Sequence, residues 1–573
     1  MNKNKVTFGK VFKNIIWPRK KLLFIGIFLI IISKAAGLVT PIMMKPFVNN
    51  ALGKDMDLTL QIVSIVIVSI LINSLTSYLL TRFIGVEAQH LIAELRTKVQ
   101  KKVLTLPINY FDNNKSGALV SRIMSDVEGV RNLVGTGFVQ LIGGILASVA
   151  AFAYLITISF KLTIFVLLPM ALFATIALKA FGYIRPIFRE RGKKSAEVSG
   201  RLTESLNGIR VIKGFGAENQ ELHVFKNGVD EIFQLVKKSM TAQALMSSSG
   251  VLMIGLASAG VMGIGSFLGL NNGEFISYTA MIAFMVAPIL QIGNIGSQFT
   301  EAFAGLDRTE EIMSLNPEED QEIRTVELNS IDGEVIFNDV SFSYLEDSEV
   351  IKNISFKAKK GSVTALVGTS GSGKSTIAGL AASFLNPNSG NITIDGVDLS
   401  KVKLSSYRKK LGVVLQDDFL FEGSIKDNIL FSKPNASKKQ LDDAVIAASV
   451  NEFTDRFEDG IDTLIGERGV KLSGGQRQRI TIARAIIADP RILILDEATS
   501  NLDNESESLI QESLKKLMKG RTTFVIAHRL STIRQADQIL VIENGKIAEK
   551  GTHEKLLSLE GRYYNLHKYQ ARI

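Results

Sequence analysis

The chain has 573 residues, too many for one hydrophobic core, and its mean hydropathy of +0.21 is high for a soluble protein of that length. Cysteine is absent, which excludes disulfides, thiolate metal sites and cysteine-peptidase chemistry. The net charge of +10 gathers before and between hydrophobic runs, so it favours anionic lipid as a partner and not nucleic acid.

Long hydrophobic runs in residues 1–306 predict a transmembrane domain of six helices. A helix needs roughly 20 apolar residues to cross about 30 Å of hydrocarbon. Four of the runs reach that length with at most a flanking charge inside them, and the first is interrupted only by Lys34 and Lys45. The run that contains Lys179 reaches it if that side chain snorkels to the interface. The predicted spans are about 22–47, 58–83, 132–158, 161–184, 243–270 and 275–300.

The connections between these spans alternate in length. Those after the second and fourth spans, 82–131 and 185–238, are long and rich in Lys and Arg, whereas the others are short. The positive-inside bias therefore predicts that the N-terminus, both long connections and the C-terminal half are cytoplasmic. We interpret each long connection as two helices that continue the spans, with coupling turns near 116–128 and 211–218. Separate helices packed on the bilayer are the alternative.

Residues 307–334 are predicted to be a polar linker, and residues 335–573 have ordinary globular composition. In this second half short apolar runs alternate with helical stretches, which predicts an α/β domain with a largely parallel core sheet. The predicted strands are Val335–Phe337, Val363–Val367, Val413–Leu415, Ile492–Leu495 and Thr523–Ile526.

The second predicted strand leads into a segment with the phosphate-loop pattern G-x-x-x-x-G-K-[ST] and then into a helix. The glycines let backbone N–H groups turn toward phosphate oxygens, and the helix N-terminus adds a favourable dipole. Lys374 would supply positive charge to the β- and γ-phosphates, and the Ser375 hydroxyl would bind Mg²⁺. The predicted ATP contacts here are Gly368, Thr369, Ser370, Gly371, Ser372, Gly373, Lys374, Ser375 and Thr376.

A later apolar strand, Ile492–Leu495, ends in Asp496 and is followed by Glu497. An aspartate at a strand end beside a phosphate loop suits Mg²⁺, here through a water molecule. The next carboxylate can polarise the attacking water as a general base. We therefore predict that Asp496 takes part in metal binding and that Glu497 is catalytic.

Between these motifs, Ser473, Gly474, Gly475 and Gln476 begin a helix and resemble the signature of ATP-binding cassette (ABC) proteins. In this family the signature of one subunit contacts the ATP that is bound by the other. The same resemblance implies that a homodimer with two competent sites forms, and an intact heterologous partner is the alternative.

Other segments match the family pattern in the expected order. Their resemblance implies that Tyr344 stacks on adenine, that Gln416 senses Mg²⁺ and the γ-phosphate, and that His528 contacts the γ-phosphate. Gln416 and His528 are thereby counted with Glu497 as catalytic, and Gln416 with Ser375 and Asp496 as metal-binding. Residues 500–503 are similar to the D-loop that ends in Asp503, although position 501 is Asn where Ala is commoner. Residues 466–469 are similar to the segment that exporters place before the signature.

Six spans before one cassette resemble a type IV ABC exporter half-transporter. Residues 44–53 resemble the end of the first span in lipid-A-type flippases, and residues 111–122 resemble the first coupling region of many exporters, bacterial multidrug exporters among them. The resemblance implies a multi-pass protein of the bacterial cytoplasmic (inner) membrane whose ATPase domain is cytoplasmic. It also implies ATP and Mg²⁺ as cofactors.

Lys34 lies near the middle of the first span. A lysine there costs about 2.5–3.5 kcal/mol on insertion scales, which the surrounding apolar residues offset. We expect it to face a wet or protein-lined surface, and we hypothesise that it lines a central cavity and attracts an anionic group such as a lipid phosphate. In the alternative interpretation it snorkels or pairs with a structural acceptor.

Together these features predict ATP-driven export or flipping of an amphipathic, lipid-like or hydrophobic substrate by alternating access. The partners would be a second copy of the chain, membrane lipid and that substrate, with no nucleic acid. An ATP-gated regulator or channel and an exporter-shaped importer are alternatives. The six predicted spans argue against a soluble cassette protein that acts on ribosomes.

Overall fold

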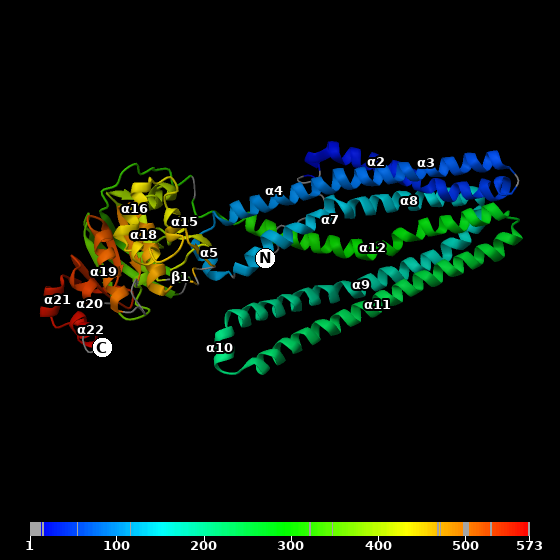
Figure 1. The fold of residues 1–573 in the computed structure, drawn as a ribbon. Helices are drawn as coiled ribbons and strands as arrows, with labels where there is room; N and C mark the ends of the chain where they lie inside the picture. The colour runs from blue at the N-terminus through cyan, green and yellow to red at the C-terminus, as the bar shows by residue number, and fades with distance from the viewer. Residues whose placement is uncertain are drawn as a thin grey trace. The chain divides into compact units, whose positions relative to one another are not determined.

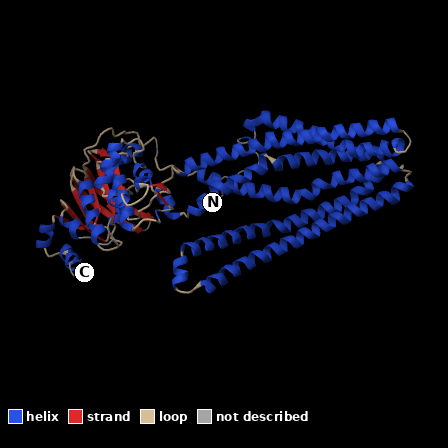
Figure 2. Cartoon of the chain, in the orientation of Figure 1, coloured by secondary structure: helices blue, strands red, loops and turns tan. Residues whose placement is uncertain are grey.

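The structure is a computed structural model of the whole chain, and it describes residues 13, 17–53, 55–114, 116–319, 322–345, 348–416, 418–466, 469, 471–496, 504–527 and 530–570. It divides into two compact units, Met1–Leu104 with Asn114–Leu315, and Thr105–Asn113 with Asn316–Ile573. Figure 1 traces the chain, and Figure 2 shows that the first unit is helical whereas the second holds the strands. We call them the helical unit and the α/β unit. The presence of one all-helical unit and one α/β unit confirms the predicted fold class.

The helical unit consists mainly of long helices that are apolar enough to cross a membrane. Five helical runs among the described residues meet that criterion of length and composition: Trp17–Ala51, Met56–Val103, Gly117–Ile158, Phe160–Asn207 and Glu218–Phe267. The main helices are α2 (Lys20–Pro46), α3 (Met56–Leu80), α4 (Val86–Val103), α8 (Thr136–Ile158), α9 (Phe160–Asn207), α11 (Glu218–Phe267) and α12 (Asn272–Met313).

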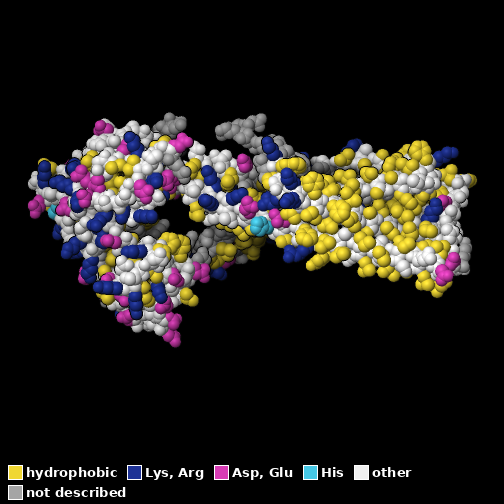
Figure 3. Space-filling model, turned by 90° about the horizontal axis from the view of Figure 1, so that it is seen from above, with side chains coloured by type: hydrophobic (Ala, Val, Ile, Leu, Met, Phe, Trp, Pro, Cys, Tyr) yellow, Lys and Arg dark blue, Asp and Glu magenta, His cyan; other side chains and the backbone are white. Residues whose placement is uncertain are grey.

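Much of the surface of this unit is hydrophobic. Figure 3 shows apolar side chains over a broad part of its visible face, whereas side chains of both charges are interspersed over the α/β unit. In α3, for example, Leu60, Ile70 and Leu71 are exposed, which a helix in water would not favour. Hydrocarbon around the spans removes that penalty, so the surface fits a membrane domain.

The fourth and fifth spans continue into the second long connection without a break. α9 contains Pro169 and Pro186 yet runs as one helix to Asn207, and α11 begins at Glu218. The two helices lie side by side along their length, joined by α10 (Ile209–Gly214), as Figure 1 shows. Near the reversal Gly216 has a φ of +60°, a conformation that glycine adopts without strain.

The first long connection is interrupted N-terminal to the expected range. The sequence predicts a coupling turn near 116–128, with Gly117 as the candidate break, but Gly117 lies within α6 (Ser116–Ser121). The helical run stops instead after Val103, and α5 (Ile108–Asn113) follows. Pro107 explains this position, because proline has no N–H and disfavours helical backbone at the residue before it.

The returning part of this connection is α6, the π-helical turn η5 (Arg122–Asp126), η6 (Val127–Gly129) and α7 (Val130–Val134). It crosses α12 at very short range, since a Cβ on Gly129 would lie 2.7 Å from the Cα of Ala302. Glycine at this crossing therefore lets the two backbones touch.

The α/β unit contains two main sheets. A four-stranded antiparallel sheet has the order β2-β1-β4-β5, and a six-stranded sheet has the order β12-β11-β3-β10-β9-β6. In the second sheet all neighbouring pairs are parallel except β11 with β12, which confirms the predicted largely parallel core. The strands are β1 (Val335–Leu345), β2 (Ser348–Ala358), β3 (Val363–Val367), β4 (Ser389–Ile394), β5 (Val397–Asp398), β6 (Leu411–Val414), β9 (Ile492–Asp496), β10 (Thr522–Ile526), β11 (Gln538–Glu543) and β12 (Lys546–Gly551).

Hydrophobic cores lie on both faces of the parallel sheet. Along β3, Ala365 and Val367 belong to one core and Leu366 to the other, as the two-residue repeat of a strand requires. The first core is shared with helix α18 (Gly474–Ala488), and the second with helix α13 (Lys374–Ala381) and the antiparallel sheet. The loops at the carboxyl edge of the sheet are thereby held between two packed layers.

Candidate functional site

The segments singled out by their motifs meet at the carboxyl edge of the parallel sheet. The phosphate loop follows β3, Gln416 follows β6, and Asp496 ends β9. Because β3, β10, β9 and β6 are adjacent and parallel, their carboxyl ends lie along the same edge. That edge is where open α/β sheets bind their ligands.

The phosphate loop has the backbone that the glycine pattern predicts. Gly371 has a φ of +77° and Gly373 a φ of +107°, and Gly373 is the N-cap residue of α13. Side chains other than glycine adopt these φ values only with strain. The loop therefore turns tightly into the N-terminus of α13, which directs backbone N–H groups and positive dipole toward an anion.

Lys374 lies along this loop with only 6% of its surface exposed. Its Nζ donates to the carbonyl of Gly368 at 3.0 Å and to that of Thr369 at 2.8 Å. The loop backbone thus holds the ammonium close to the N-terminus of α13. A phosphate bound there would meet one full positive charge and the partial charge of the helix.

Ser372 gives an independent indication of a missing oxygen ligand. The side chain is 4% exposed, and its hydroxyl finds no hydrogen-bond partner among the described residues. Most buried hydroxyls in folded proteins have one. A phosphate oxygen is an acceptor of the right chemistry for this donor, so the loop fits a nucleotide better than it fits an empty turn.

Tyr344 of β1 offers an aromatic face near the same helix. Its hydroxyl lies 3.3 Å from the Thr376 hydroxyl, with either atom able to donate, and its ring meets Phe342 edge to face at 4.9 Å. The side chain is nevertheless 47% exposed. A ring that is fixed by neighbours yet open on one side can stack on a planar base.

The residues proposed for Mg²⁺ supply oxygen donors of the right kind. Ser375 and Gln416 are exposed, and Asp496 is partly buried at its strand end. The described residues include no cluster of three or more His, Cys, Asp or Glu side chains able to hold a metal. A cation at this edge would therefore share its coordination with phosphate oxygens and water, which is the usual arrangement for Mg²⁺ in nucleotide sites.

The signature segment forms the start of α18. Ser473 is the N-cap residue, its hydroxyl accepts from the Gln476 N–H at 3.3 Å, and the Gln476 Oε1 accepts from the Ser473 N–H at 2.9 Å. This capping box stabilises the helix start, and Gly474 keeps the approach to it free of side chains. The N-terminus of this 15-residue helix is suited to bind an anion.

Two arginines fix α18 in the α/β unit. Arg484 donates to the backbone of Asn428 at 2.8 Å and stacks over Phe431, and burial lowers the pKa of its guanidinium from the usual value. Arg479 lies over Phe453 at 4.9 Å and donates to the Ser449 carbonyl at 3.1 Å. The helix that carries the signature is thus held as a rigid element.

Several predicted site residues lie outside the described part of the chain. These are the general base Glu497, the D-loop residues 500–503 with Asp503, and the γ-phosphate contact His528. Within residues 466–469, only Gly466 and Gly469 are described. The roles of Glu497, Asp503 and His528 stay predictions.

In the helical unit, Lys34 of α2 is half-buried and passes over Gly143 of α8. A Cβ on Gly143 would lie 2.7 Å from the Lys34 Cε, so the absence of a side chain there makes room for the lysine. The adjacent Ser33 is buried, and its hydroxyl donates to Oδ1 of Asn73 in α3 at 2.8 Å. Polar side chains of α2 and α3 therefore meet within the predicted spans, whereas the role of Lys34 in a substrate cavity stays a prediction.

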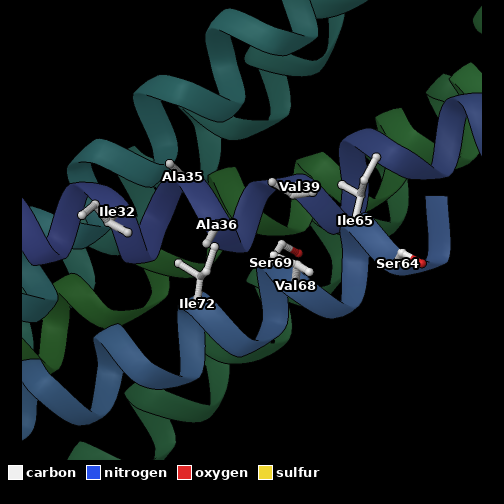
Figure 4. A pocket seen from close by; sticks show the side chains of 9 residues that line it. All are labelled: Ile32, Ala35, Ala36, Val39, Ser64, Ile65, Val68, Ser69 and Ile72. Carbon is white, nitrogen blue, oxygen red and sulfur yellow. The ribbon is translucent and has the colours of Figure 1, made fainter. Parts of the chain in front are cut away.

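A groove between α2 and α3 differs in chemistry from this polar region. The hydroxyls of Ser64 and Ser69 donate to carbonyls of their own helix, at 2.7 and 2.8 Å, so the groove offers mainly apolar contact. Figure 4 shows its lining, which is Ile32, Ala35, Ala36, Val39, Ser64, Ile65, Val68, Ser69 and Ile72.

A second set of residues, which the sequence pattern does not predict, joins the predicted polar linker to the α/β unit. Arg324 is buried and donates to the carbonyls of Leu399 and Val402 at 2.9 and 3.0 Å, and Glu318 forms an ion pair with Arg408 at 2.6 Å. The one local signal is Arg324, an arginine close in sequence to several glutamates. Its partners, far along the chain, could not be identified from that pattern.

Two family models match the chain. Residues 23–289 match the model described as ABC transporter transmembrane region. Residues 351–500 match the model described as ABC transporter. The first match falls in the helical unit apart from Thr105–Asn113, and the second includes the phosphate loop and the signature.

Proteins similar over nearly their whole length include transporters of several names. The chain is 34% identical to the ATP-dependent lipid A-core flippase of Desulfotalea psychrophila (strain LSv54 / DSM 12343), which covers 99% of this chain and 100% of the relative. It is also 34% identical to YgaD of Bacillus subtilis (strain 168), whose name proposes a multidrug export ATP-binding/permease protein, over 98% of this chain and 99% of the relative. A solved bacterial Atm1-family ABC exporter with ATP bound is similar with a TM-score of 0.83 and 26% identity, over 96% of this chain and 98% of that chain.

Proposed function

This chain belongs to the ABC transporter family, as an exporter-type protein with its transmembrane region and ATPase domain in one polypeptide, and from that premise we propose the site roles, assembly and substrate class below. It is an ATP-binding, multi-pass membrane protein that couples ATP hydrolysis to export. The observation that carries this function is the phosphate loop, in which Lys374 and the hydroxyl of Ser372 are buried beside the N-terminus of α13.

The chain's own groups have distinct roles in hydrolysis. Lys374 and the loop N–H groups bind the phosphates, and Tyr344 stacks on the adenine. Glu497 acts as general base toward the attacking water. Gln416 and His528 contact the γ-phosphate region. Loss of the γ-phosphate therefore releases the closed state of the paired ATPase domains.

Ser375, Gln416 and Asp496 would hold Mg²⁺, with Asp496 acting through water. When bound, the metal would offset the phosphate charge that develops during hydrolysis. The support for this assignment is the oxygen chemistry of the three side chains and their common position at the carboxyl edge of the sheet.

The functional assembly is a homodimer in which Ser473–Gln476 of one protomer complete the ATP site of the other. The support is the capping box at the start of α18, which leaves a rigid, glycine-lined helix N-terminus for an anion. The phosphate loop in the same chain already has a helix N-terminus of its own, that of α13. A second N-terminus therefore suits a γ-phosphate presented by another protomer.

The protein resides in the cytoplasmic membrane of a bacterium, with its N-terminus and α/β unit in the cytoplasm. The concentration of Lys and Arg before the first span and in the two long connections, after the second and fourth spans, supports this orientation. Bacterial flippases among its relatives are consistent with that membrane.

The substrate is amphipathic or lipid-like, and it moves from the cytoplasmic to the outer side. Lys34 would attract the anionic group of such a molecule in the cavity, while apolar helix surfaces accept its hydrocarbon part. The names of the relatives, a lipid A-core flippase and a multidrug export protein, fall in this chemical range.

The test uses the full-length protein in vesicles of phosphatidylethanolamine and phosphatidylglycerol that contain a fluorescent phosphatidylglycerol. External ATP and Mg²⁺ act on molecules whose α/β unit faces outward, and dithionite then measures the lipid left in the outer leaflet. We expect the protected fraction to rise with ATP in the wild type and not in Glu497→Gln. Hoechst 33342 uptake provides the matching measurement for a hydrophobic cation.

The outcomes separate the alternatives. ATP hydrolysis without movement of lipid or cation would favour an ATP-gated regulator or channel. Movement away from the vesicle interior, on the molecules that external ATP reaches, would favour an importer. Absence of ATP hydrolysis in a folded protein would refute the assigned ATP site.

A further inference from the structure

Residues 316–319 and 322–328, which we call the strap, follow α12 and bind along residues 399–406 of the α/β unit. Val326 forms a parallel bridge with Val402, and its N–H donates to the Lys401 carbonyl at 2.9 Å. Arg324 of the strap is buried against residues 399–402, and desolvation lowers the pKa of its guanidinium from the usual value. The strap therefore moves with the domain to which it is bound.

Glu318 in the strap binds two segments that are distant in sequence. Its carboxylate forms a two-pronged ion pair with Arg408, with Nη1–Oε2 at 2.9 Å and Nη2–Oε1 at 2.6 Å. Its backbone N–H donates to the carbonyl of Thr105 at 2.7 Å. Thr105 begins Thr105–Asn113, the part of the first long connection that belongs to the α/β unit.

On its other side, Arg408 binds the end of the helix that carries the phosphate loop. Arg408 belongs to α14 (Leu404–Arg408), and its Nη2 also donates to the Ser383 carbonyl at 3.2 Å. The preceding Tyr407 is fully buried, and its hydroxyl donates to the Ala381 carbonyl at 2.5 Å. Both carbonyls lie at the C-terminal end of α13, where positive charge is favourable.

The short helix α14 also leads directly into the strand before Gln416. The Lys410 N–H donates to the Tyr407 carbonyl at 2.8 Å, and β6 begins at the next residue, Leu411. α14 is thus joined to both elements that carry nucleotide-facing residues, α13 through hydrogen bonds and β6 through the chain.

We propose that Glu318 and Arg408 are positioning residues that transmit the nucleotide state of α13 to Thr105 in the first long connection. This role rests on the proposed function and adds a route that starts from the phosphate-loop helix. α13 has eight residues and acts as a rod about 12 Å long. Close-packed elements shift as units, and a two-pronged pair resists rotation where a single bond would act as a hinge.

The test measures amide hydrogen exchange by mass spectrometry on the full-length protein in nanodiscs of phosphatidylethanolamine and phosphatidylglycerol. It compares the nucleotide-free state with the state trapped by ATP, Mg²⁺ and vanadate. In the wild type we expect peptides of 368–381 and of 105–113 both to gain protection. This readout needs no cargo.

In Arg408→Lys the charge remains but the two-pronged geometry is lost. We expect 368–381 to respond as in the wild type, while the protection gained by 105–113 falls by about 2- to 30-fold, the range for a residue that couples two sites. Glu318→Gln keeps the size of the side chain and should have the same effect. The double variant should be no worse than either single one, because all three break the same pair.

A matched control is a second ion pair between the strap and residues 399–406. Lys403 and Glu327 form an exposed pair at 3.3 Å, and the variant with Lys403→Gln and Glu327→Gln should leave both responses unchanged. The proposal would be wrong if 105–113 responded normally in Arg408→Lys and Glu318→Gln. It would also be wrong if 368–381 lost its response together with 105–113, because the pair would then support the ATP site itself. A wild type without ATP-driven flux would refute export and leave this result untouched.

Discussion

The carboxylate of Asp126 receives two hydrogen bonds of 2.6 Å from the guanidinium of Arg308. Asp126 ends the π-helical turn η5, and Arg308 lies in the part of α12 that the same turn crosses. Gly305 allows this crossing, because a Cβ there would overlap the Asp126 backbone. The last helix of the helical unit and the returning part of the first long connection are thereby held together.

Arg308→Ala should destabilise the helical unit. The Asp126 side chain is only 9% exposed, but Arg308 is 46% exposed and water can replace part of its contact, so the lost pair costs about 1–3 kcal/mol. The measurement is the midpoint of thermal unfolding in detergent. Lys194→Ala, which removes exposed pairs with Glu197 and Glu231, is the control and should shift the midpoint much less. Equal stability of Arg308→Ala and the control would contradict this prediction.

Glu497→Gln should retain ATP and hydrolyse it very slowly. The amide cannot accept the proton of the attacking water, so turnover should fall by about 10²- to 10⁴-fold. Phosphate release and retention of labelled ATP measure the two effects. Glu512→Gln, at an exposed position of α19 (Asn504–Met518), is the matched control with normal turnover. Near-normal turnover in Glu497→Gln would show that the base is another residue.

Lys34→Gln should reduce the stimulation of ATPase activity by phosphatidylglycerol and leave the basal rate intact. The amide is polar but neutral, so it removes the attraction for an anionic head group. ATPase activity is measured over a series of vesicles with rising phosphatidylglycerol content. Lys179→Gln is the control, since this lysine of the fourth predicted span is exposed. Unchanged stimulation in Lys34→Gln would support the snorkelling or structural alternative.

The C-terminal helices α21 (His553–Ser558) and α22 (Arg562–Gln570) should separate in acid. His553 Nδ1 lies 2.7 Å from the Tyr563 hydroxyl, and burial raises the pKa of that phenol to about 12, so it stays protonated and can donate to Nδ1 of the neutral imidazole. Burial, with His567 and Arg534 nearby, lowers the pKa of His553, and Glu554 opposes this only in part.

The direction in which the stability of this contact changes with pH follows from proton binding. Because the folded-state pKa is below the usual value of about 6.5, the unfolded chain binds more protons in the interval between the two values. The stability of this contact is therefore complete above about pH 6.5 and falls as the pH drops toward the lowered pKa. Limited proteolysis of the C-terminal segment between pH 7.5 and 5.5 measures the change.

His553→Gln provides the control, because its amide oxygen still accepts from Tyr563 but does not titrate. This variant should show a smaller increase in cleavage on acidification than the wild type. An equal increase in both would mean that another group, such as His567, controls the acid response.

Local chemistry in the sequence determined the two-part organisation and the phosphate site. Uncharged runs of membrane length need no partner to be identified, and the loop from Gly368 to Ser375 is contiguous with the strand before it and the helix after it. The largely parallel sheet followed from short apolar runs for the same reason. Within these segments the decisive residues are neighbours in the chain, so spacing is enough.

Only the tertiary structure decided how distant residues pair. Glu318 and Arg408 are 90 positions apart, and the sequence around Glu318 reads as a polar linker. Glycine is a common helix breaker and predicts the first break at Gly117, yet that exposed glycine lies within α6, and the helical run ends earlier, before Pro107. The contact of Lys34 with Gly143 was equally hidden. Such pairings depend on which surfaces the folded chain brings together, and no local pattern encodes that.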